Sequence, residues 1–147
     1  MNINKLLDID LSGHPPSISL PRIRLPGGET DQLSFHRKLT KYDYIDIATY
    51  TISISLSNIN RCLFTKSQTR WIKHDGEFFI QCDNIHAKII ICYRRKKPVR
   101  VYIGSMNFVH SSDLIDIMIP IDRVLMVNNI VSYYNQLFES ALSQCHS

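Results

Sequence analysis

The chain has 147 residues, 44% of them hydrophobic, which is enough to bury the core of one folded domain. No apolar run approaches the ~20 residues of a membrane-spanning helix. The first ten residues (MNINKLLDID) contain acidic residues and no long apolar segment, so they do not resemble a signal peptide. The four cysteines form no CxxC pair. We therefore expect a cytoplasmic protein with neither a zinc site nor a disulfide framework; its net charge of +4 fits an anionic partner, although so modest an excess is also common without one.

Residues 1–28 are rich in proline and glycine, which predicts a turn-rich N-terminal arm with at most a short helix near Ile3–Leu7. Arg22 and Arg24 alternate with apolar neighbours, so this part of the arm could be an edge strand or could cross a partner. We favour a segment that only covers the rest of the protein. Residues 29–147 then form the domain.

A short helix is predicted next. Thr30 or Asp31 can cap its N-terminus, and it runs to about Lys41. We expect the core to be partly covered by three of its side chains, Leu33, Arg37 and Leu39.

Residues 41–56 (KYDYIDIATYTISISL) are rich in β-formers and predict a strand. Its alternation separates the side chains into two faces. One face carries Ile45, Ile47, Thr49 and Thr51; the other carries Asp46, Ala48, Tyr50 and Ile52.

The stretch from Asn84 to Phe108 predicts a β-hairpin, because two apolar runs flank a basic, proline-bearing break. A short strand within residues 76–84 leads into it. If Ile89–Tyr93 runs out and Val99–Ile103 runs back, the segment Gly104–Asn107 returns beside His86.

His86 and Lys88 are two residues apart, so on a strand both point to the same face. Together with Ser105 and Asn107 they form a set that suits a phosphodiester. An imidazole can attack phosphorus, while lysine, serine and asparagine hold the charged oxygens without any metal or cofactor.

Two elements complete the chain. Residues 114–122 (LIDIMIPID) predict a strand whose end lies at an edge or bend, because Pro120 cannot donate to a neighbour. Residues 127–145 predict a helix with an apolar stripe that is core or dimer surface. We expect an α/β protein with a layered sheet flanked by helices. The stripe consists of Val127, Val131, Tyr134, Phe138, Leu142 and Cys145.

The pattern His-x-Lys followed by Gly-Ser-x-Asn at the end of the next strand resembles the HKD motif of the phospholipase D superfamily, and "NIHAKI…YIGSMNF" is most similar to its endonuclease branch. The resemblance implies that His86 is the covalent nucleophile and Lys88 a phosphate clamp, with Ser105 and Asn107 as further phosphate contacts. Family members usually carry a glutamate on the next strand that orients the histidine. Asp116 stands at the best-matching place, with Asp113 as second candidate.

The chain departs from the family pattern at several points. The family's aspartate five residues after the lysine is replaced by Tyr93, and the longer lysine-to-glycine spacing would be absorbed by the RRKKP turn. The family places a helix after the first strand, and residues 55–64 (SLSNINRCLF) fit its start. Most members of the family also have an additional strand–helix unit at the position of residues 66–76. The resemblance therefore implies an abbreviated phospholipase D-like domain.

The resemblance further implies a metal-independent phosphodiesterase that cleaves nucleic acid, DNA more readily expected than RNA, through a phosphohistidine. The chemistry needs two facing histidines, and the chain has one His-x-Lys element, so we expect a homodimer with a shared site. Cleavage is then non-specific or targeted by a partner protein. Two alternatives stay open: a degenerate nucleic-acid-binding module, and a subunit or inhibitor that pairs with a larger nuclease of the same fold.

The densest positive charge lies at the hairpin turn, about 20 Å from His86 at the usual rise per strand residue. It is expected to contact phosphates remote from the cut, or to be simply solvated. The candidate nucleic-acid-binding residues are Arg94, Arg95, Lys96, Lys97 and Arg100.

Overall fold

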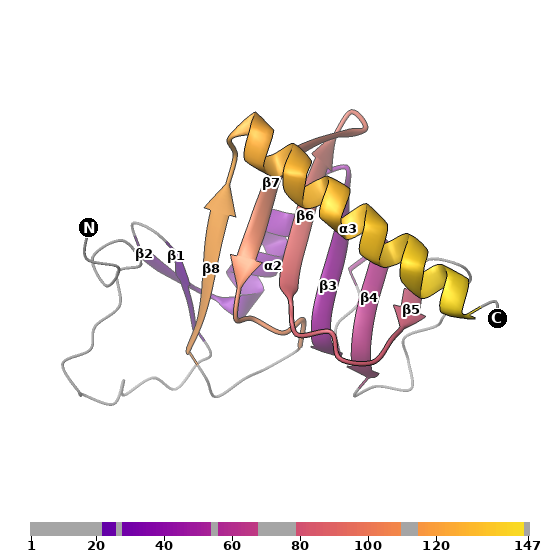
Figure 1. The fold of residues 1–147 in the computed structure, drawn as a ribbon. Helices are drawn as coiled ribbons and strands as arrows, with labels where there is room; N and C mark the ends of the chain where they lie inside the picture. The colour runs from indigo at the N-terminus through magenta and orange to yellow at the C-terminus, as the bar shows by residue number, and fades with distance from the viewer. Residues whose placement is uncertain (1–21, 26–27, 54–55, 68–78, 110–114, 146–147) are drawn as a thin grey trace, which may run out of the picture.

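The protein is built on one mixed sheet of eight strands in the order β2-β1-β8-β7-β6-β3-β4-β5 (Figure 1). The computed structural model describes residues 22–25, 28–53, 56–67, 79–109 and 115–145. The strands are β1 (Arg22–Leu25), β2 (Gly28–Asp31), β3 (Tyr44–Ile52), β4 (Ile59–Ser67), β5 (Phe79–Gln81), β6 (Lys88–Arg94), β7 (Lys97–Gly104) and β8 (Ile115–Ile121).

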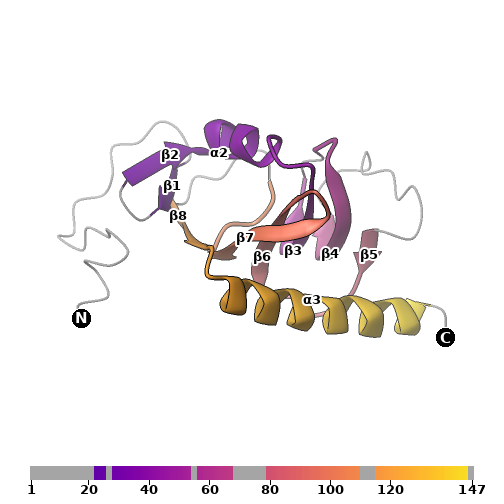
Figure 2. The same cartoon turned by 90° about the horizontal axis from the view of Figure 1, so that it is seen from above.

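Two helices cover opposite faces of this sheet, α2 (Gln32–Leu39) on one side and α3 (Val124–Cys145) on the other (Figure 2). Each face therefore has its own apolar cluster. The α2 cluster includes Phe35, Leu39 and the strand residue Ile90, and the α3 cluster includes Tyr134, Phe138 and its strand neighbour Ile91. The predicted α/β class with a layered, helix-flanked sheet is confirmed.

The start of α2 is fixed by Asp31, whose carboxylate accepts a hydrogen bond from the Ser34 backbone N–H at 2.7 Å, as expected of an N-cap. The predicted buried face is wrong in part. Leu33 is 61% exposed and Arg37 is exposed, because the residues at spacing i, i+3, i+4 and i+7 face the sheet instead. These are Gln32, Phe35, His36 and Leu39.

The helix expected in residues 55–64 is wrong, since Ile59–Ser67 forms β4, parallel to β3. The three consecutive residues Cys62, Leu63 and Phe64 are all buried, because Leu63 packs into the α3 cluster on one face and its two neighbours pack into the α2 cluster on the other. A strand buried on both faces lacks the period-two alternation that marks a half-buried strand. Residues 68–78 lie outside the described residues.

The predicted hairpin is confirmed as β6 and β7, which pair antiparallel from Lys88 opposite Gly104 to Arg94 opposite Lys97. Arg95 and Lys96 form the two-residue turn with φ of 52° and 63°, the left-handed values that such turns require. The short strand before the hairpin is β5, and the strand after it is β8.

The segment Arg22–Leu25 does more than cover the protein, and that expectation is wrong. It forms β1, which pairs parallel with β8 and antiparallel with β2, so it is an inner strand. Its pairing with β8 ends at Ile117, so Pro120, which pairs with Tyr102 of β7, has no strand partner on its other side among the described residues, as predicted for an edge position. The possible helix at Ile3–Leu7 lies outside the described part of the chain.

Helix α3 begins at Val124, slightly earlier than predicted, and its stripe packs into the core from Val127 to Leu142. Arg61 of β4 forms an ion pair with Asp46 of β3, and the same Nη2 donates a hydrogen bond to Asn135 Oδ1 of α3; both distances are 2.7 Å. The second bond joins the helix to the sheet. The Tyr134 hydroxyl donates to the Ile47 carbonyl at 2.8 Å. Among the described residues, no helix is long and apolar enough to cross a membrane.

Candidate active site at the open end of the hairpin

The hairpin register brings Lys88 directly opposite Gly104, where the candidate site lies. Gly104 in turn pairs with Met118 of β8. A Cβ at position 104 would overlap the backbone carbonyl oxygen of Ile117, so only glycine allows β7 and β8 to approach this closely.

Ser105 and Asp116 meet beside this glycine. Ser105 Oγ donates to Asp116 Oδ1 at 3.1 Å and accepts from the Ile117 backbone N–H at 3.0 Å. Asp116 is only 8% exposed, and burial raises its pKa, while the Ser105 hydrogen bond and the positive charge of Lys88 act to lower it. Lys88 is therefore near enough to Asp116 for its charge to act on that carboxylate.

Asn107 ties the exit of β7 to the end of β3. Its Oδ1 accepts from the backbone N–H of Thr51 at 3.1 Å and from Thr49 Oγ1 at 3.3 Å. Within the described ranges its amide nitrogen has no protein acceptor, so its two N–H groups can donate to an anion.

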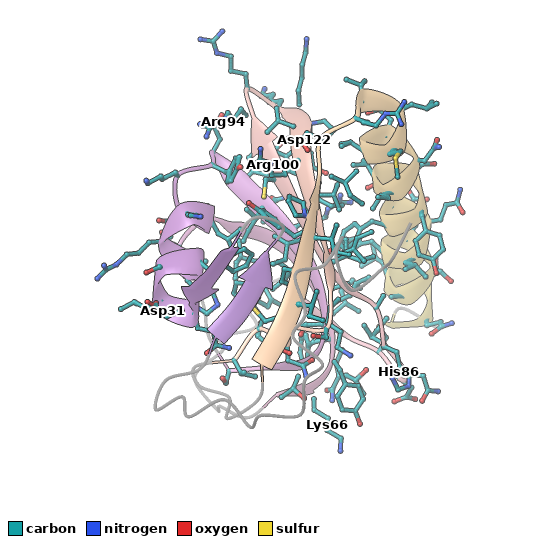
Figure 3. All side chains as sticks on the ribbon, turned by 90° about the vertical axis from the view of Figure 1, so that its left-hand side faces the viewer. Asp31, Lys66, His86, Arg94, Arg100 and Asp122 are labelled. Carbon is teal, nitrogen blue, oxygen red and sulfur yellow. The ribbon has the colours of Figure 1, made fainter. Side chains whose placement is uncertain are left out.

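His86 lies at the same end of the sheet but precedes β6, which begins at Lys88, so strand alternation does not extend to it. Its exposed ring stacks on that of Tyr50, with centroids 5.6 Å apart and 12° between planes. Lys66 Nζ lies 5.6 Å from the centroid of the same Tyr50 ring, and Figure 3 shows His86 and Lys66 at one end of the molecule. Asp116, bonded to Ser105, makes no hydrogen bond to His86, and Asp113 lies outside the described residues.

A pocket of about 360 Å³ joins His86 and Lys88 to α3. His86, Lys88 and Gly104 form one wall, and the helix forms the other. The side chain of Lys88 lies on the α2 face of β6 with that of Ile90, so its charge acts on Asp116 rather than inside this pocket. The remaining lining residues are Ala87, Ile89, Ile103, Asn129, Ile130 and Tyr133.

The basic turn lies at the opposite end of the hairpin from His86, as the register and Figure 3 agree. Its four basic side chains, Arg94 to Lys97, are exposed. The Arg94 guanidinium lies 4.6 Å from the ring centroid of Tyr42, and the Arg95 backbone N–H donates to Asp43 Oδ2 at 2.6 Å. Arg100 is paired with Asp122 at 3.0 Å.

The structure thus gathers His86, Lys88, Ser105, Asn107 and Asp116 at one end of the sheet, but in two groups. His86 and Lys88 line the pocket, whereas Ser105 and Asp116 bind each other and Asn107 binds the end of β3. In the described part of the chain, no group of three or more His, Cys, Asp or Glu side chains could hold a metal ion.

The sequence did not predict two neighbours of His86, Tyr50 and Tyr133. Both are brought near the histidine by contacts between residues far apart in the sequence. Pairing of Ala48 with Ile89 brings the end of β3 beside the start of β6, and this register is invisible in a single sequence. Comparison of the chain with protein-family models, with curated proteins and with solved structures gives no match.

Proposed function

We propose that the protein is a metal-independent phosphodiesterase that cleaves nucleic acid through a covalent intermediate on His86. The observation that supports this most is that an exposed imidazole and a lysine lie at one end of the sheet, beside a pocket that both residues border. A nucleophile and a cation at one end of the sheet suit an electrophilic, anionic phosphorus centre. The motif's resemblance to the phospholipase D superfamily adds to this argument.

In the proposed first step, a nitrogen of His86 attacks phosphorus, an N–P bond forms and the P–O bond to the leaving group breaks. Lys88 and the amide N–H groups of Asn107 bind the non-bridging oxygens, whose negative charge they stabilise. Water then attacks phosphorus, the N–P bond breaks and a phosphate monoester is released.

The leaving oxygen needs a proton, which we assign to the imidazolium of His86 from a second copy of the chain in a homodimer. That imidazole accepts a proton from the attacking water in the second step, so the cycle closes. Imidazole suits both roles because it titrates near neutrality. Mixing wild-type and His86→Ala chains should depress activity more than simple dilution does.

A second candidate, a nucleic-acid-binding module without catalysis, is favoured by a specific observation. The Ser105 hydroxyl is already committed to Asp116 and Ile117, and Asp116 is not bonded to His86. The side chains of Ser105 and Asp116, which would assist His86 in catalysis, therefore make their hydrogen bonds to each other and to the backbone instead.

The deciding experiment incubates purified protein with labelled DNA and RNA in excess chelator. Cleavage by the wild type and its loss in His86→Ala and Lys88→Met are expected, while Lys38→Met, which changes an exposed lysine of α2, serves as matched control. Full activity in His86→Ala would refute the proposal. A gel shift without cleavage by the wild type would establish the binding module instead.

A further inference from the structure

The wall of the pocket opposite His86 belongs to α3 and has a different chemistry. Tyr133 is 55% exposed, a large fraction for an aromatic side chain, and it lies one helical turn after Asn129. Ile130 and Ile103 complete this wall as partly buried apolar surface. An aromatic face, a carboxamide and an apolar floor therefore meet in one place.

These groups match the requirements of a nucleobase. Bases stack on aromatic side chains, and a carboxamide can both donate to and accept from a base edge. The pocket volume of about 360 Å³ lies within the range of small-ligand sites. Since the opposite wall carries His86, one cavity offers an imidazole to a phosphate and a stacking surface to the adjoining base.

We propose that this pocket is a nucleobase subsite, in which an unpaired base stacks on Tyr133 and bonds to Asn129 while its phosphate lies at His86. The inference rests on the proposed function and specifies its substrate class as single-stranded nucleic acid. A base inside a duplex is paired and stacked on both faces, so it reaches such a pocket only after it leaves the helix. Duplex substrates therefore bind and react more weakly than single strands of the same sequence.

The test measures binding rather than cleavage, with His86→Asn protein, which lacks the nucleophile. The probes are a short single-stranded oligonucleotide that contains 2-aminopurine and the same strand annealed to its complement. The fluorescence of the single strand should be quenched on binding, and the duplex should bind at least about tenfold more weakly. Adding Tyr133→Ala should remove the quenching and lower the affinity roughly 5- to 150-fold, the usual range for one base stacked on an aromatic residue.

Tyr133→Phe, which keeps the ring, should retain quenching and affinity. Met126→Ala changes another exposed apolar residue of α3 outside the pocket and serves as control. Unchanged affinity and quenching in Tyr133→Ala, or equal binding of both probes, would overturn the subsite alone. Failure of the His86→Asn and wild-type proteins to bind either probe would overturn the proposed substrate class as well. Dissociation of a dimer by Tyr133→Ala, seen by light scattering, would assign Tyr133 to a subunit interface and overturn the subsite.

Discussion

The basic turn offers a sharp test, because it can be neutralised without disturbing the fold. The two central residues, Arg95 and Lys96, adopt φ of 52° and 63°, a conformation that Asn-Gly adopts more readily. The variant Arg94→Ser/Arg95→Asn/Lys96→Gly/Lys97→Ser removes four charges and installs the preferred turn residues. The hydrogen bond to Asp43 survives, since it comes from the Arg95 backbone N–H.

We expect this variant to bind nucleic acid more weakly and with less dependence on salt. If all four charges contact phosphates, the slope of log K against log salt should fall by about 3 for a single strand, at about 0.7 per phosphate. The affinity lost by the wild type between 50 and 200 mM salt should then exceed that lost by the variant about 50-fold. Fluorescence anisotropy at several salt concentrations measures both slopes.

The saturated single-turnover rate should change little, because Lys88 and Arg94 are six strand residues apart, or roughly 20 Å. A variant with Arg37→Gln and Lys38→Gln removes two exposed charges of α2 and shows, per charge, the effect of a lower net charge alone. A large fall in the saturated rate with intact affinity would show that the turn reaches the reacting phosphate, which would refute the reasoning.

Three further predictions concern the support of the site and of the fold. Tyr50→Leu should lower kcat about tenfold or more with little change in KM, because the His86 ring loses the aromatic ring on which it stacks. Tyr50→Phe keeps that ring and should retain the wild-type rate. Equal rates in the two variants would contradict a role of Tyr50 in orienting His86. Arg61→Met should lower the free energy of unfolding, measured in urea, by about 3–5 kcal/mol, because it leaves the Asp46 carboxylate, which is 1% exposed, without its ion-pair partner. Adding Asp46→Asn should recover much of this loss. A loss below about 1 kcal/mol would contradict a stabilising role for the pair. The free energy of unfolding of the wild type should rise relative to that of Asp116→Asn as pH falls from neutral, because the raised pKa of Asp116 in the folded state means that folding favours its protonated form. The gain is complete below the pKa of an unfolded aspartate, about 3.9. Parallel stability-versus-pH profiles of the two proteins would contradict the raised pKa.

Local patterns predicted some elements well. The hairpin was predictable because two apolar runs flank a compact basic break, and α2 because Asp31 is a strong N-cap. The helix expected at residues 55–64 failed because β4 is buried on both faces and carries no alternation. Burial of that kind follows from the layers above and below a strand, which no local window contains.

The candidate site was predictable to a similar degree. Spacing alone brought Lys88 opposite Gly104, since both belong to one hairpin. The bond between Ser105 and Asp116 needs the β7–β8 register, and the stack of His86 on Tyr50 needs the β3–β6 pairing. Such contacts depend on non-local strand order, so the sequence predicted which residues gather but not how they pair.

The most direct test of the central claim is to trap the covalent intermediate. Wild-type protein is mixed with a labelled oligonucleotide in chelator, quenched under alkaline conditions within one turnover, digested and analysed by mass spectrometry. A nucleotidyl phosphate should be found on the peptide that contains His86, and it should be absent from the His86→Asn protein. An adduct on another residue would contradict covalent catalysis by His86. So would rapid cleavage that leaves no adduct on any residue and inverts the configuration at phosphorus.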